Sequence, residues 1–224
     1  MPNLSKRLKL ISSLVPIGAR VCDIGTDHGY LSIELSKTAS KVIAADINEK
    51  PLETAKKNAL KYGVSDIEFR LCDGLSAIKK EEVDTVIIAG IGGEVISGII
   101  ERGMNIAANK DITLILQPTT SPEFLRRFLL NNGFQIEKDI PISENGKIYS
   151  VMVVKYTGDT VLCSNAFYFI GKVSPLTFDG LAYIKKQYNR CLKNANAMKS
   201  IPEKQKEFEY YNDICKDIEK LLER

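Results

Sequence analysis

The sequence lacks the features of several protein classes. Its cysteines are odd in number and none forms a Cys-x-x-Cys pair, which argues against a disulfide framework or a zinc site. No apolar run is long enough to span a membrane, and none follows the basic N-terminal residues as a signal peptide requires. We therefore expect a protein of the reducing cytoplasm, with no metal and no membrane contact.

The overall charge is also uninformative. The formal net charge is only +3, and 26% charged with 44% hydrophobic residues is an ordinary globular mixture. The length of 224 residues favours one α/β domain with a small appendage over two full domains. Any binding to nucleic acid must therefore be argued from local clusters of charge.

Strand-like and helix-like patterns alternate along the first two-thirds of the chain. This alternation predicts a Rossmann-like α/β domain, with a mostly parallel sheet and helices on both faces. Residues 134–142 and 148–156 add an antiparallel hairpin that turns at Glu144-Asn145-Gly146. We expect the other strands at 20–24, 41–45, 67–71, 83–89 and 113–116, and the helices at 3–14, 29–37, 49–62, 93–102 and 121–131, the last beginning at Ser121 as N-cap.

The composition changes after Tyr156. Two stretches, 178–199 and 203–223, carry apolar residues at helical spacing and are separated by Pro202. They predict an antiparallel, coiled-coil-like helix pair, which an ordinary stabilising or dimerising hairpin would also explain. We place the Rossmann-like domain at residues 1–157 and the helical domain at 158–224.

The turn after the first strand suggests a ligand with a cationic end. Ligands of open α/β sheets bind beyond the carboxyl ends of the strands. The glycines here do not follow Gly-x-Gly-x-x-Gly, and the carboxylates of Asp23 and Asp27 would repel a pyrophosphate, which argues against a nicotinamide enzyme. S-adenosylmethionine, with its ammonium and sulfonium groups, fits this turn; a purely structural turn is the alternative.

Acidic residues also follow the second and third strands. Asp46 can accept hydrogen bonds from ribose hydroxyls, and Asp73 can accept one from the adenine amine, although each could simply cap a helix. Together with Asp23 they describe an adenosine with a cationic tail. The expected cofactor residues are Asp23, Gly25, Thr26, Asp27, His28, Gly29, Asp46, Ile47, Asp73, Gly74, Gly90 and Gly92.

The last two strand ends are expected to face the methyl acceptor. Glycines at 90, 92 and 93 allow close approach of a flat substrate, and Gln117-Pro118 is polar at the same edge. His28, the only histidine, could act as a base, although positioning the loop or ligand explains it as well. The catalytic candidates are Asp27, His28 and Gln117.

These motifs together resemble one known family. DIGTDHGYL from Asp23, AADIN from Ala44, RLCDGL from Arg70, IAGIGG from Ile88 and LILQP from Leu114 are similar to segments of the TrmK family, the bacterial tRNA (adenine(22)-N1)-methyltransferases. The resemblance covers about residues 3–156 and extends loosely over the C-terminal helices; Ile91 stands where the family has Met. It implies tRNA as substrate, methylated on N1 of adenine 22 in the D-arm.

With this substrate, basic and aromatic residues become candidates for RNA contact. We expect a monomer, while leaving a dimer open. A methyltransferase for a small molecule or protein, and a binding module without catalysis, are the competing hypotheses. The substrate candidates are Arg7, Tyr30, Gly93, Gln117, Pro118, Arg126 and Arg127, with Lys185, Lys186, Arg190, Lys193 and Lys199 on the C-terminal helices.

Overall fold

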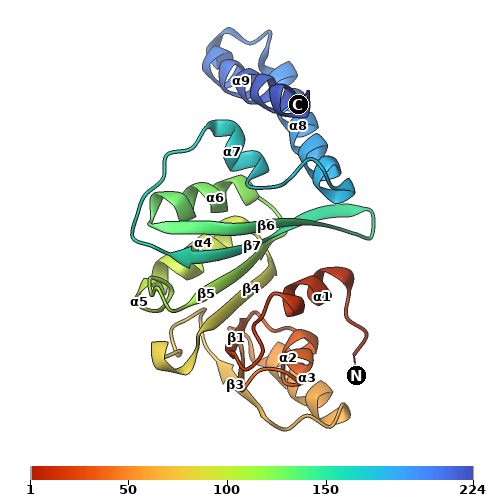
Figure 1. Ribbon diagram of the computed structural model, residues 1–224, viewed down its shortest axis with the longest axis vertical. Helices are drawn as coiled ribbons and strands as arrows, with labels where there is room; N and C mark the ends of the chain where they lie inside the picture. Colours follow the sequence, from red (N-terminus) through yellow and green to blue (C-terminus); the bar gives the residue numbers. More distant parts are fainter. Residues whose placement is uncertain (1, 224) are drawn as a thin grey trace.

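A single seven-stranded sheet organises the molecule (Figure 1). The computed structural model describes residues 2–223, and its strand order is β3-β2-β1-β4-β5-β7-β6. Strands β1 to β5 are parallel, while β7 runs antiparallel to both β5 and β6. The predicted Rossmann-like class is therefore confirmed. The strands are β1 (Arg20–Ile24), β2 (Lys41–Asp46), β3 (Ile67–Leu71), β4 (Thr85–Ile91), β5 (Thr113–Pro118), β6 (Phe134–Glu144) and β7 (Lys147–Tyr156).

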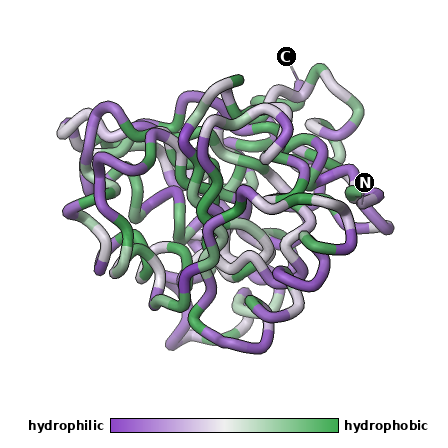
Figure 2. Tube along the Cα trace, turned by 90° about the horizontal axis from the view of Figure 1, so that it is seen from below, coloured by the Kyte–Doolittle hydropathy of each residue, from purple (hydrophilic) through white to green (hydrophobic). Residues whose placement is uncertain are grey.

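Helices cover both faces of the sheet because its central strands are apolar on both sides. In β4, Val86 and Ile88 pack with Ile96 on one face, while Ile87 packs with Ile33 on the other. Hydrophobic stretches cross the interior, and much of the outer contour is hydrophilic (Figure 2). One face carries α1 (Lys6–Ser13), α2 (Tyr30–Leu35) and α3 (Glu49–Lys61); the other carries α4 (Gly93–Arg102), α5 (Met104–Ala107) and α6 (Pro122–Asn131).

Two strands extend further than their apolar runs suggest. β4 continues to Ile91 and β5 to Pro118, so the predicted ends at 89 and 116 are wrong. The register of β4 shifts between Ala89 and Ile91, where Gly90 has a φ of +84°. Such a bulge redirects the chain at the end of a strand. Ser121 does precede α6, but its hydroxyl caps no helix N–H and lies 3.2 Å from Glu94 Oε1 instead.

The C-terminal segment forms three α-helices and a short 3-10 helix, Pro202–Lys204, and its hydrophobic cluster also includes Ile148 of β7. The long helices α8 (Phe178–Met198) and α9 (Gln205–Leu222) pack against each other as predicted, with side chains such as Ile184 and Ile218 buried between them. The short helix α7 (Asn165–Ile170), which lacks enough turns to show a periodicity, lies between this pair and α6 (Figure 1). We retain 1–157 and 158–224 as proposed domains; their end residues 1 and 224 lie outside the described range.

Two general features concern the described part of the chain. Among residues 2–223, no helix is both long and apolar enough to cross a membrane, and no group of three or more His, Cys, Asp or Glu side chains is arranged to hold a metal ion. Cys22, Cys72, Cys163, Cys191 and Cys215 are all free thiols.

Candidate active site

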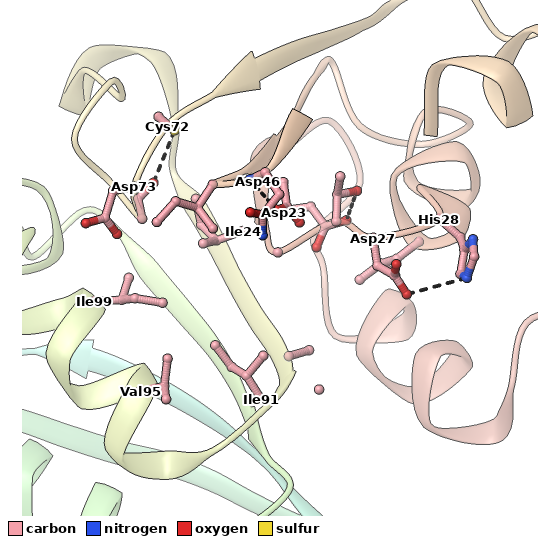
Figure 3. Close-up of a pocket in the computed structure, with 18 of the residues that line it drawn as sticks. Asp23, Ile24, Asp27, His28, Asp46, Cys72, Asp73, Ile91, Val95 and Ile99 are labelled. Carbon is pink, nitrogen blue, oxygen red and sulfur yellow. Dashed lines mark hydrogen bonds and ion pairs between the residues drawn. The ribbon is translucent and has the colours of Figure 1, made fainter. Parts of the chain in front are cut away.

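A cavity of about 620 Å³ opens at the carboxyl ends of β1, β2 and β4, where the strand order reverses direction (Figure 3). Most of the predicted cofactor residues line it: Asp23, Gly25, Thr26, Asp27, His28, Asp46, Ile47, Asp73, Gly74 and Gly90. Arg7 and Tyr30, predicted to contact the substrate, also line it. The other predicted residues, Gly29, Gly92, Gly93, Gln117, Pro118, Arg126 and Arg127, do not.

Asp23 supplies a buried carboxylate at the base of the cavity. It is 4% exposed, and its Oδ2 accepts hydrogen bonds from Thr26 Oγ1 at 2.9 Å and Ser32 Oγ at 2.7 Å. Among the residues described, none donates to Oδ1. Burial raises the pKa of Asp23, and the two hydroxyl hydrogen bonds oppose this only in part. A cation placed at this point would relieve the cost of the buried charge.

The Asp27–His28 segment forms one end of the cavity. Asp27 adopts a left-handed backbone with a φ of +49°, which is uncommon outside glycine. Its carboxylate lies 3.6 Å from His28 Nε2, and the His28 ring stacks on Tyr30 with centroids 5.5 Å apart. Figure 3 shows the Asp27–His28 pair beside Asp23. The pair is largely exposed, so it stands where a second molecule could reach the cavity.

Asp46 and Asp73 extend the acidic side toward the opposite end. Asp46 is buried, and its Oδ1 accepts the N–H of Asn48 at 2.9 Å. Asp73 is half exposed and pairs with Arg102 at 3.0 Å. No donor within residues 2–223 is bonded to the second oxygen of either carboxylate.

The facing wall is apolar and was missed from the sequence. Ile91, Val95 and Ile99 project toward the acidic residues (Figure 3). Val95, Ile99 and Arg102 are spaced three or four residues apart on α4 and so share one face of the helix. This stripe reaches beyond the residues that the core needs, since Val95 is 56% exposed. In the sequence, the signal was the helical spacing of these apolar residues, which does not distinguish a core face from a cavity wall.

Gln117 is placed differently from its prediction. Its side chain is 0% exposed, and its Oε1 accepts hydrogen bonds from Gly90 N at 3.1 Å and from Arg7 Nη1. Its Nε2 donates to the carbonyl of Pro118 at 2.8 Å. Because these groups are already bonded, Gln117 does not contact a substrate in this conformation. It fixes the Gly90 bulge and the Arg7 side chain that line the cavity.

Helix α1 brings Arg7 to the cavity and is held there by the β6–β7 hairpin. The Glu144 carboxylate accepts the Arg7 backbone N–H at 2.9 Å and pairs with its guanidinium at 3.5 Å. The guanidinium carbon also lies 5.7 Å from the centre of the Tyr149 ring. Burial alone would raise the pKa of Glu144, but the hydrogen bonds and charge of Arg7, with Ser5, hold it below its ordinary value.

Arg126 lies in the interior and not at the surface where it was predicted. It was predicted to contact RNA, yet it is 0% exposed, so that prediction is wrong. Its guanidinium pairs with buried Asp139 at 2.8 Å and donates to Tyr183 Oη at 2.9 Å. It also donates to the carbonyls of Tyr168 and Phe169 in α7. Burial would lower the pKa of Arg126, but Asp139 raises it above its ordinary value, so this charged side chain joins α6 and β6 to α7 and α8.

Some of the other basic candidates are bonded to groups within the protein, and several are exposed at its surface. Arg127 is exposed, but it stacks over Tyr168 at 4.6 Å and donates to Tyr210 Oη at 3.0 Å, away from the cavity. Arg190 pairs with Glu123 at 2.8 Å, and Lys186 donates to the Ile148 carbonyl at 2.9 Å. The exposed candidates of α8 and its end are Lys185, Lys186, Lys193 and Lys199.

Comparison with known proteins identifies the family. Residues 4–152 match a family described as a methyltransferase domain. The chain is 39% identical to the tRNA (adenine(22)-N(1))-methyltransferase of Bacillus subtilis over 155 residues, 68% of this chain and 65% of that enzyme. The crystal structure of the B. subtilis m1A22 tRNA methyltransferase TrmK matches with a TM-score of 0.82 and 29% identity, covering 99% of this chain and 98% of that one. This chain belongs to the TrmK family.

A second TrmK structure bears on the ligand. Mycoplasma capricolum TrmK, solved with S-adenosylhomocysteine, matches with a TM-score of 0.80 and 26% identity over 97% of this chain and 99% of that one. The cavity of the present chain has the chemistry for such a molecule: carboxylates along one side, an apolar wall opposite, and a volume within the range of small-ligand sites. The resemblance drawn from the sequence motifs is thus confirmed at the level of the family.

Proposed function

We propose that this chain transfers a methyl group from S-adenosylmethionine to N1 of an adenine in tRNA. The observation that carries the proposal is the convergence of Asp23, Asp46 and Asp73 from three successive strand ends in one cavity that faces an apolar wall. The family relationship extends over nearly the whole chain. A transferase for a small molecule or protein would share the cofactor site but would not need the basic residues of α8.

The cofactor would be held by the acidic side of the cavity. Asp23 suits the ammonium group because it is a buried carboxylate with a free oxygen. Asp46 suits the ribose hydroxyls, and the space between Asp73 and Ile99 suits adenine. When bound, S-adenosylmethionine supplies an electrophilic methyl group on its sulfonium.

The residues around the acceptor have mainly to align it. N1 of adenine has a free lone pair at neutral pH, so no strong base is needed for attack on the methyl group. The protein must fix the base in line and exclude water. The Gly90 bulge, held by Gln117 and Arg7, and the stacked His28–Tyr30 pair form the boundary where the base would enter.

The tRNA must yield its adenine before it can react. N1 lies on the Watson–Crick edge, so a paired adenine has to be freed and turned out of its stack. We propose the D-arm position 22 by analogy with the B. subtilis relative. Exposed lysines of α8, such as Lys185 and Lys193, would contact phosphates at some distance from the cavity.

Methyl transfer from labelled S-adenosylmethionine to unmodified tRNA tests the proposal. The nucleosides are then separated and identified by mass spectrometry. We expect N1-methyladenosine, and its loss when adenine 22 of the transcript is replaced by guanine. A chain that binds the cofactor but labels no tRNA would instead support the small-molecule or protein acceptor.

A further inference from the structure

The segment that connects α7 to α8 presents two large apolar side chains to solvent. Leu176 is 93% exposed and Phe178, the first residue of α8, is 87% exposed. Single exposed apolar residues are common on protein surfaces. Here a leucine and an aromatic ring stand two positions apart, on the segment that leads into the proposed RNA-binding helices.

This segment is anchored on both sides of the exposed residues. The Asp179 carboxylate accepts hydrogen bonds from Ser143 N at 3.1 Å and Ser143 Oγ at 2.7 Å. Thr177 caps α8 by accepting the N–H of Gly180 at 3.0 Å. At the other end, Gly171 packs so closely on the Arg126–Asp139 pair that a Cβ would lie 1.9 Å from Asp139 Oδ2. Phe178 is thus held outward by a fixed backbone.

The groove beside Phe178 is lined by one lysine and two aspartates. It is bounded by the segment and by β6, and its two carboxylates are already engaged, Asp139 with Arg126 and Asp179 with Ser143. Lys172 is exposed and makes no ion pair with any of residues 2–223. An aromatic face beside an available lysine and hydroxyl groups suits an unpaired nucleotide, whose base stacks while its phosphate meets the lysine.

The position of this groove relates it to the cavity. Asp179 is bonded to Ser143, and the next residue, Glu144, holds Arg7 at the cavity wall. Figure 1 shows the start of α8, the tip of the β6–β7 hairpin and α1 along the same side of the molecule. An RNA that reaches from α8 to the cavity would pass over Phe178.

We propose that Leu176 and Phe178 form a platform on which an unpaired base of the RNA substrate stacks, with Lys172 contacting its phosphate. This proposal rests on the proposed function, because it takes tRNA as the substrate. The platform lies outside the cofactor cavity. It would therefore govern tRNA binding and leave cofactor binding unchanged.

Steady-state methylation of tRNA by Phe178→Ala tests the platform. We expect KM for tRNA to rise about 10-fold, the loss of one stacked base, with kcat, cofactor affinity and melting temperature unchanged. Ile17→Ala is the matched control. Ile17 is 88% exposed and lies before the amino end of β1, whereas the cavity opens at the carboxyl end of that strand. An unchanged KM in Phe178→Ala, or an equal rise in the control, would overturn the platform.

A direct signal is available because the sequence contains no tryptophan. Phe178→Trp introduces a single indole, whose fluorescence we expect tRNA to quench in a saturable way, whereas Ile17→Trp should not respond. Absence of quenching while the variant still methylates tRNA would refute the platform alone. A wild-type chain that methylates no tRNA would refute the proposed function instead. A wild-type dimer in light scattering that Phe178→Ala dissociates would assign the surface to a second copy.

Discussion

At the scale of single residues, position in the strand pattern was enough to find Asp23, Asp46 and Asp73. Each lies at or within two residues of the carboxyl end of a strand, and parallel strands bring these ends to one edge. Gln117 and Arg126 could not be assigned in this way. Their burial depends on α1, α7 and α8, which approach from distant parts of the sequence. Residue type at a strand end predicts proximity to a site, but not which polar groups the protein itself has already engaged.

Asp23 provides a pH-dependent test. Because the ammonium group of the cofactor prefers an ionised carboxylate, affinity should be full above the raised pKa of Asp23 and fall as pH decreases through it. Asp23→Asn should weaken binding about 10- to 100-fold at neutral pH, as expected for loss of a charged hydrogen bond, and remove this pH dependence. Titration calorimetry at several pH values measures both. Unchanged affinity in Asp23→Asn would place the ammonium group elsewhere.

Substitution of Gln117 tests whether this residue positions the cavity wall without contacting the substrate. Gln117→Leu leaves the Gly90 N–H and the Arg7 guanidinium without their acceptor, at a cost of about 1–3 kcal/mol. We expect kcat for tRNA methylation to fall about 10-fold with a much smaller change in cofactor affinity. Gln117→Glu retains the acceptor and should recover part of the rate. If cofactor affinity falls as much as kcat in both variants, Gln117 serves the cofactor site instead.

At the scale of elements, periodicity located the long helices and most strands but not their contacts. α4 was predicted at residues 93–102 and occupies those residues, whereas the six-residue helix α7 escaped detection. The docking of α1 also had no sequence signal. It depends on Glu144, which was predicted only as part of a turn and in fact ends β6 and binds the first turn of α1.

Glu144→Gln tests this docking. The pKa of Glu144 is lower in the folded protein than in the unfolded chain, where it is about 4.3. Its carboxylate therefore stabilises the folded protein at pH values above the unfolded pKa, and this contribution is lost as the pH falls through the folded pKa. At pH 7 we expect the variant to be less stable by about 1 kcal/mol, because the charge that pairs with Arg7 is lost while an acceptor oxygen remains. The two proteins should converge in urea unfolding as the pH falls below about 4. A difference that persists at lower pH would show that the charge is not responsible.

At the scale of the whole molecule, Arg126 connects the sheet to the helical segment through one buried charge. Composition could not reveal this, because an arginine on an amphipathic helix is normally solvated. Its partners come from β6, β7, α7 and α8. The orientation of α8, and with it the exposed lysines and Phe178, is therefore set by contacts inside the protein.

Removing one partner of this pair should be costly. Arg126→Met leaves Asp139 buried and unpaired, and we expect a loss of about 3–5 kcal/mol in the free energy of unfolding. Arg126→Met combined with Asp139→Leu should be less destabilised than Arg126→Met alone, because no isolated charge remains. Urea unfolding of the two variants provides the comparison. A double variant that is as unstable as Arg126→Met, or less stable, would contradict this account.

The same arginine gains its partners in a fixed order as the chain is synthesised. All its bonded partners lie 13 to 57 residues further along the sequence. When β7 has emerged from the ribosome, Asp139 and Ser150 can already bond the guanidinium, but its partners in α7 and α8 have not yet emerged. The nascent sheet thus carries a hydrated Arg126–Asp139 ion pair on the surface that α7 and α8 later cover.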